Sequence, residues 1–140
     1  MTRYYSWDQG GVHPTKSMST LNMDLLAGHR LALEDLFEPS SPYEQALAEY
    51  VIPELRSFCD TFEKGFLNPH YDHIADAAAT GSSSYESFLV RTSGLEIVFD
   101  YYEVGPYAAG PISVVVPWDV LRPWLPKGSA VAAFVAAAYS

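Results

Sequence analysis

Histidines and a carboxylate between residues 70 and 76 are the best candidates for metal chemistry in this 140-residue chain. On a helix, His70, His73 and Asp76 would share one face, because residues three or four positions apart are neighbours there. Zinc accepts imidazole and carboxylate ligands. The alternative is a solvated polar face beside a loop, with His70 as an end residue. We expect this alternative, and therefore neither a bound metal nor a cofactor.

Nucleophilic catalysis requires a serine, cysteine or threonine beside a base. The serines of residues 82–84 follow Gly81 in a predicted flexible connection, and Cys59 lies among phenylalanines, which favours an inert buried thiol. His13 could act as a base, but we expect it to hold loop carbonyls in a structural turn with Gly10 and Gly11. The chain also lacks a G-x-S-x-G elbow, a P-loop and an H-E-x-x-H motif. We therefore predict no catalytic residues.

Residues 100–107 combine carboxylates with tyrosines on a loop that proline braces. Tyrosine provides a large contact area at low entropic cost, and carboxylates attract cationic partners. The alternative is a corner that covers the core, in which the rings simply pack. We expect a mixture of the two, with the segment forming a binding surface. The candidate binding residues are Asp100, Tyr101, Tyr102, Glu103 and Tyr107.

The charge balance excludes several classes of partner. Eight basic residues against 17 acidic ones give a net charge of −9, whereas binding to nucleic acid or to anionic lipid requires a surplus of lysine and arginine. A basic protein or a neutral polymer is compatible with this balance. The single cysteine excludes an internal disulfide and a cysteine-based metal cage.

No segment of the chain has the pattern of a signal peptide or a membrane span. The first ten residues have no apolar core, and the longest apolar stretch, residues 130–139, is about half of a span. We therefore predict no signal, anchor or span in these residues. The aromatic-rich residues 3–7 predict a strand that runs into the turn at Gly10 and Gly11. A strand so close to Met1 suggests a domain that is truncated at its N-terminus.

Alternating residues predict a strand over 16–25, with Leu21, Met23 and Leu25 facing the core. A turn at residues 27–28, an extended piece over 30–33 and one helical turn over 34–37 follow.

The clearest helix begins near residue 42. Ser41 can cap it, Pro42 suits its first position, and Glu44 completes a capping box. An interior proline, Pro53, predicts a kink or a break. The apolar stripe of this helix consists of Leu47, Tyr50, Val51, Leu55, Phe58 and Phe62.

The remaining elements lie in the C-terminal third of the chain. Residues 88–91 and 95–99 form a predicted hairpin, with Gly94 where a positive φ is wanted. A buried strand over 112–116 and a short helix over 117–125 follow, and the alanine-rich tail 126–140 could be helix or strand. We predict an α+β fold, with a mostly antiparallel sheet and a long kinked helix and a short C-terminal helix packed on one face.

Several of these stretches carry a family resemblance. Residues 94–111, continued by residues 114–118, resemble the C-terminal signature of the RsiV/PdaC-like domain family. The glycines and histidine of residues 10–14 are similar to that family's Gly-Gly-Ala-His turn. The resemblance covers residues 4–125, so residues 1–140 are identified as one such domain with the tail 126–140 as an extra element.

The resemblance implies an α+β domain that lies outside the cytoplasmic membrane of bacteria. Members occur in an anti-sigma factor ectodomain that binds lysozyme and beside the catalytic domain of peptidoglycan deacetylases, and the domain itself is not regarded as catalytic. We therefore expect a non-catalytic domain that binds or senses a lysozyme-like protein or a cell-wall ligand such as peptidoglycan. The alternatives are a cell-envelope hydrolase and a structural accessory module.

Overall fold

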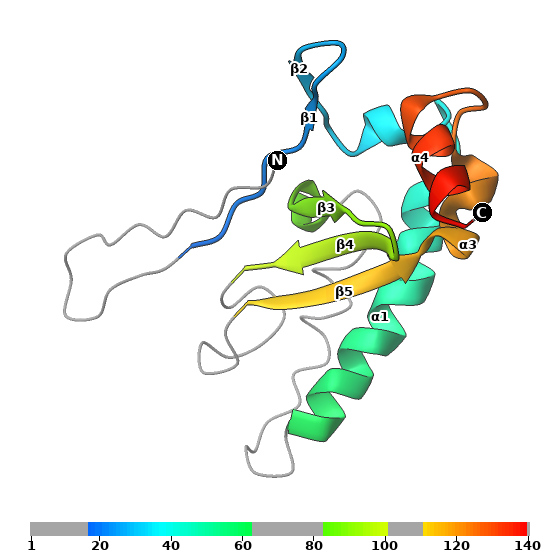
Figure 1. The fold of residues 1–140 in the computed structure, drawn as a ribbon. Coiled ribbons are helices and arrows are strands. Elements are labelled where there is room, and N and C mark those ends of the chain that lie inside the picture. Colours follow the sequence, from blue (N-terminus) through cyan, green and yellow to red (C-terminus); the bar gives the residue numbers. More distant parts are fainter. Residues whose placement is uncertain (1–16, 63–82, 101–110, 140) are drawn as a thin grey trace, which may run out of the picture.

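The chain folds as α+β, with a three-stranded antiparallel sheet and a separate two-stranded hairpin (Figure 1). The computed structural model describes residues 17–62, 83–100 and 111–139. Its strands are β1 (Met23–Asp24), β2 (His29–Arg30), β3 (Phe88–Val90), β4 (Gly94–Phe99) and β5 (Ile112–Pro117). Its α-helices are α1 (Tyr43–Phe62), α3 (Trp118–Leu121) and α4 (Ala130–Ala138). Its 3-10 turns are η1 (Glu34–Leu36), η3 (Ser83–Glu86) and η5 (Arg122–Trp124).

The central strand β4 pairs with β3 on one side and β5 on the other, both antiparallel. This register places buried side chains opposite each other on one face of the sheet, where α1 packs beside β5 (Figure 1). Cross-strand pairs of this kind stabilise a sheet by joint burial. The pairs are Leu95 with Val116, Ile97 with Val114, and Phe99 with Ile112.

Only one face of β5 is buried. Ile112, Val114 and Val116 belong to the core, but Ser113 and Val115 are exposed, and Val115 keeps 39% of its surface in solvent. The predicted buried strand is therefore buried on one face and exposed on the other. Buried and exposed positions alternate along this run of β-branched residues, and the sequence does not show it because valine suits a strand on either face.

Glycine is needed at position 94 because β5 passes close to it, and not because Gly94 adopts the predicted positive φ. The positive-φ glycines of the described chain are Gly28 and Gly128. A Cβ on Gly94 would instead collide with the backbone carbonyl oxygen of Val116 and lie 2.9 Å from Cγ1 of Val115. Glycine is needed here so that β5 can pass β4 closely.

The helix α1 packs as its apolar spacing predicts, since Leu47, Val51 and Leu55 are fully buried. Phe58, however, is 40% exposed. The helix also continues through Pro53, so of the predicted kink or break, the break is wrong. Pro53 lies on the exposed side, where water can satisfy the carbonyl that its missing N–H leaves without a partner.

Ser41 does not form the predicted capping box. The hydroxyl Oγ of Ser41 is buried and makes no hydrogen bond within the described chain. The helix begins at Tyr43, one residue later than predicted. A cap hydroxyl must accept from the second or third helical N–H, and this one does not.

The strand predicted over residues 16–25 shrinks to the two residues of β1, because Asp24 turns the chain. Its Oδ1 accepts hydrogen bonds from the backbone N–H groups of Leu26 and Ala27, at 2.8 and 2.9 Å. Gly28 then takes φ +73°. Leu25 consequently reaches the tip of the hairpin with 80% of its surface exposed, so its predicted core position is wrong. The buried residue of this segment is Thr20.

The alanine-rich tail is a helix that joins the core. Ser129 caps α4, its Oγ accepting from the N–H of Ala132 at 3.1 Å, and Val135 belongs to the hydrophobic core. No helix in the described ranges is long and apolar enough to cross a membrane.

Candidate functional site

Most of the residues singled out from the sequence lie outside the described ranges. These are Gly10, Gly11, His13, His70, His73, Asp76, Tyr101, Tyr102, Glu103 and Tyr107. Ser82 lies outside them as well. Cys59 belongs to α1, but its side chain is not part of the described structure. Ser83 and Ser84 open the 3-10 turn η3, within the stretch for which the sequence predicts a flexible connection.

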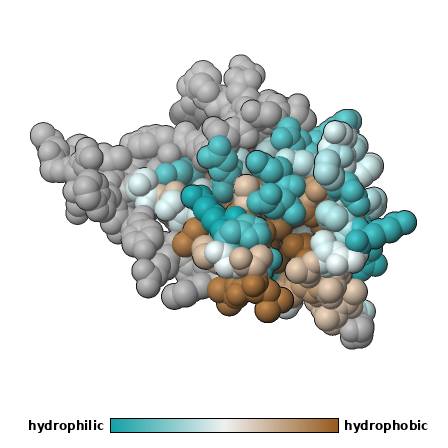
Figure 2. Space-filling model, turned by 90° about the horizontal axis from the view of Figure 1, so that it is seen from above, coloured by the Kyte–Doolittle hydropathy of each residue, from teal (hydrophilic) through white to brown (hydrophobic). Residues whose placement is uncertain are grey.

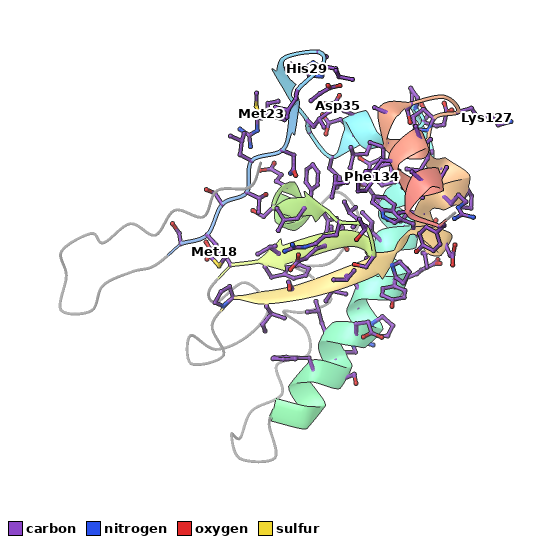
Figure 3. All side chains as sticks on the ribbon, viewed as in Figure 1. Met18, Met23, His29, Asp35, Lys127 and Phe134 are labelled. Atoms are coloured by element: carbon purple, nitrogen blue, oxygen red, sulfur yellow. The ribbon has the colours of Figure 1, made fainter. Side chains whose placement is uncertain are left out.

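Asp100 is the one predicted binding residue that the structure describes. It follows the last residue of β4 and is half-buried. Its Oδ1 accepts a 3.0 Å hydrogen bond from the backbone N–H of Met18, near the open end of the sheet (Figure 3). This carboxylate therefore joins β4 to the segment before β1.

A cleft with a volume of about 400 Å³ opens where the segment before β1, the turn η1, the start of α1 and the turn η3 meet. We call it the acidic cleft. Its lining residues include carboxylates, tyrosine rings, small polar side chains and apolar side chains. They are Thr20, Asn22, Arg30, Leu31, Ala32, Leu33, Glu34, Tyr43, Glu44, Tyr85, Glu86 and Phe88.

One wall of the acidic cleft is held by two side chains that bond the backbone of Phe88. The N–H of Phe88 donates to Oγ1 of Thr20 at 2.9 Å, and Nδ2 of Asn22 donates to the carbonyl oxygen of Phe88 at 2.7 Å. The backbone carbonyl oxygen of Asn22 in turn accepts a 2.9 Å hydrogen bond from the backbone N–H of Leu31. These bonds connect the edge of β3 to the hairpin, because buried backbone groups need partners.

Two tyrosines with different surroundings face the acidic cleft. Tyr85 is buried and meets Phe99 edge to face, with ring centroids 6.5 Å apart. Burial, reinforced by the negative charge of Glu44, raises the pKa of Tyr85 to about 12. Tyr43 stacks on Phe37 at 4.2 Å, and burial together with the neighbouring glutamates raises its pKa as well. Both phenols therefore stay neutral hydrogen-bonding groups at neutral pH.

The charge of the acidic cleft is negative. Its lining holds Glu34, Glu44 and Glu86 against one cation, Arg30. Glu34 and Glu86 have no ion-pair partner among the described residues. Within these ranges, no three histidine, cysteine, aspartate or glutamate side chains converge closely enough to hold a metal ion. The carboxylates are spread around aromatic walls, an arrangement that suits an ammonium or guanidinium group on a larger partner.

Sequence reasoning missed this cleft. Thr20 and Asn22 stand two positions apart in the alternating segment 16–25, on the side opposite the predicted core positions Leu21, Met23 and Leu25. Nothing in the sequence indicates that they contact the backbone of Phe88, which is 68 and 66 residues away.

Comparison with known families gives a match over residues 34–119, to the family described as "Protein of unknown function (DUF3298)". This match covers more than half of the chain. The chain belongs to the DUF3298 family. The matched residues include η1, α1, η3, the three-stranded sheet and the first two residues of α3. They supply part of the lining of the acidic cleft, namely Glu34, Tyr43, Glu44, Tyr85, Glu86 and Phe88.

Two solved DUF3298 structures share the fold. A member from Bacteroides fragilis NCTC 9343 aligns over 95% of this chain with a TM-score of 0.68 and 22% identity. A DUF3298 protein from Pseudomonas aeruginosa PAO1 aligns over 84% of the chain with a TM-score of 0.56 and 16% identity. The chain spans about half the length of each, 50% in both cases. No curated protein matches this DUF3298 chain.

Proposed function

We propose that this DUF3298 chain is a non-catalytic binding domain that takes a basic protein through the acidic cleft. The single observation that carries the proposal is the cleft itself, with three glutamates and one arginine arranged around two tyrosines. The described lining contains no histidine, cysteine or serine, and its one threonine, Thr20, uses its hydroxyl oxygen to accept a hydrogen bond from the N–H of Phe88.

Long-range charge supports the same proposal. The net charge of −9 attracts a basic protein from a distance and speeds encounter. The cleft then provides the specific contact, because a lysine or arginine side chain can place its charge among the glutamates and its alkyl part against the rings.

The resemblance to the RsiV/PdaC-like domains supports the finer part of the proposal. It favours a place outside the bacterial cytoplasmic membrane, a lysozyme-like protein as partner, and the tyrosine and carboxylate segment 100–107 as a further part of the contact. Peptidoglycan is the second ligand to test.

The test is calorimetric titration of the chain with hen egg-white lysozyme at about 0.15 M and at about 1 M salt, where the Debye length falls from about 8 Å to about 3 Å. Saturable micromolar binding that survives high salt supports the proposal. A heat signal that vanishes at high salt would mean that lysozyme is attracted only non-specifically by the acidic charge of the chain.

Matched variants locate the contact. We expect Glu44→Gln with Glu86→Gln to weaken lysozyme binding about tenfold or more, since a few central residues carry most of an interface's energy. The control, Glu49→Gln with Glu54→Gln, makes the same charge change on α1 outside the cleft lining, and should leave affinity within about twofold. Equal losses of lysozyme affinity in the two double variants would show that the acidic cleft is not the contact surface.

Release of fragments from peptidoglycan by the purified chain, abolished by Glu44→Gln, would overturn the non-catalytic assignment.

A further inference from the structure

A second concavity lies on the other side of the hairpin base and differs in character from the acidic cleft. This apolar groove has a volume of about 640 Å³ and runs between the β1–β2 hairpin and α4. Figure 3 shows Met23 and His29 on the hairpin, Phe134 on α4, and Asp35 between them. Its lining is Asn22, Met23, Asp24, Leu25, Leu26, His29, Leu31, Asp35, Val90, Ser129, Ala130, Val131 and Phe134.

Both walls of the apolar groove expose apolar surface that the fold does not use. Leu25 and Leu26 stand at the hairpin tip, 80% and 97% exposed, and Phe134 is 39% exposed. Hydrophobic side chains gather along one edge of the face in Figure 2. Two adjacent leucines at such exposure, beside a groove, mark an interaction surface, because water-exposed apolar patches are otherwise kept small.

The helix α4 supports the same reading through its composition. From Ala130 to Ala138 it has no polar or charged side chain, yet only Val135 among these residues is buried. A helix that is apolar on all sides normally lies inside a protein. One side of α4 meets the core of this chain, and a further side lines the groove.

The charged groups of the groove favour some binding partners over others. Asp24 and Asp35 carry the negative charge of the lining, and His29 is its one titratable nitrogen among the described residues. Hydrogen bonds from the backbone N–H groups of Ala27 and Leu26 lower the pKa of Asp24, which favours the charged form of this carboxylate. A second copy would bring the same two carboxylates against this rim, and an anionic membrane would be repelled by it.

We infer that the apolar groove binds an apolar segment of another protein that carries a basic residue, with apolar side chains between Leu26 and Phe134 and the cation at Asp35. This surface is separate from the acidic cleft, so the inference does not depend on the proposed function. Asn22 and Leu31 line both concavities, so the hairpin base is the wall that separates them.

The probe is the end-capped peptide KLLKLLKLLK, with ELLELLELLE as its matched control, titrated into the full chain by fluorescence polarisation. We expect the lysine peptide to bind saturably and at least about tenfold more tightly than the glutamate peptide. Equal affinity for the two peptides would overturn the inference, because the rim charges would then play no part.

Variants of the full chain test the place of binding. Leu26→Ser and Phe134→Ser should each weaken the lysine peptide about tenfold, whereas Val115→Ser, at the same 39% exposure as Phe134 but on β5, should not change its affinity. Asp35→Asn keeps an oxygen for the N–H of Ala32 and should weaken binding, while Glu54→Gln on α1 should not. Because Leu26 is 97% exposed, its replacement leaves the core intact and keeps the test valid if Phe134→Ser unfolds.

Two other results would also overturn the inference. One is a monomer–dimer equilibrium in sedimentation that Leu26→Ser abolishes, which would make a second copy the occupant. The other is binding to vesicles of neutral phosphatidylcholine that exceeds peptide binding and requires Leu26, which would make the hairpin tip a lipid contact.

Discussion

The indole Nε1–H of Trp118 donates a 2.8 Å hydrogen bond to the backbone carbonyl oxygen of Arg91, 27 residues earlier. Trp118 begins α3 and is fully buried, and Arg91 follows the last residue of β3. The bond therefore joins the hairpin end of the sheet to the helix that follows β5. It satisfies the one polar atom of a large buried side chain.

Replacing this tryptophan should cost stability. We expect Trp118→Phe to lower the free energy of unfolding by about 1–3 kcal/mol, because the carbonyl of Arg91 loses its partner and the smaller ring leaves space. Urea denaturation followed by circular dichroism measures the change. Trp124→Phe, at a half-buried position, is the control and should cost less; equal losses would contradict this account.

The close passage of β4 and β5 at Gly94 makes a second prediction. Gly94→Ala should destabilise the chain by about 1–3 kcal/mol, because the new methyl group meets the carbonyl of Val116 and the strands must move apart. The neighbouring change Ser93→Ala, at an exposed position, serves as control. A thermal midpoint unchanged by Gly94→Ala would show that the hairpin adjusts without strain.

The bond between Asp100 and Met18 predicts different effects for two substitutions. Asp100→Ala should cost about 1 kcal/mol or more, since the N–H of Met18 loses its acceptor. Asp100→Asn keeps an oxygen at the same place and should cost less. Denaturant titration of the three proteins compares these free energies. The reverse order would mean that the charge of Asp100, and not its geometry, matters at this position.

The raised pKa of Tyr85 predicts a loss of stability at alkaline pH. The unfolded chain releases this proton near the ordinary tyrosine value of 10.0, while the folded chain holds it until about pH 12. Between these values the unfolded state binds fewer protons, so the free energy of unfolding falls as pH rises, by at most about 1.4 kcal/mol per pH unit. The contribution is fully present below pH 10.

Tyr85→Phe isolates this effect from the other groups that titrate at high pH. Urea unfolding of both proteins at intervals from about pH 9 to about pH 12 gives the two slopes. We expect the slope of Tyr85→Phe to be shallower. Parallel slopes would mean that Tyr85 ionises in the folded state as readily as in the unfolded chain.

Local patterns determined much of this fold. The helical spacing of Leu47, Val51 and Leu55 is enough to predict α1, and the apolar runs on either side of residues 92–94 predict the β3–β4 hairpin. Such elements depend on neighbours within one or two turns, or across a short loop, which the sequence displays directly. The same patterns sufficed for the α+β class.

Other features were decided by contacts that sequence position does not reveal. Leu25 looks like a core residue by alternation, but the side chain of Asp24 turns the backbone before it. Ser41 looks like a cap, but its hydroxyl is buried without a partner. In both cases the residue type permits the predicted role, and the contacts formed in the folded chain give another.

The sequence by itself determined the acidic balance, the long helix and the hairpin of this DUF3298 protein. Only the tertiary structure decided that Thr20 and Asn22 meet Phe88, that Glu44 and Tyr85 share one cleft, and that Leu26 and Phe134 flank one groove. The physical reason is that these groups are brought together by burial of a common core. That burial is a property of the whole chain, and no short stretch of residues encodes which distant partner it will meet.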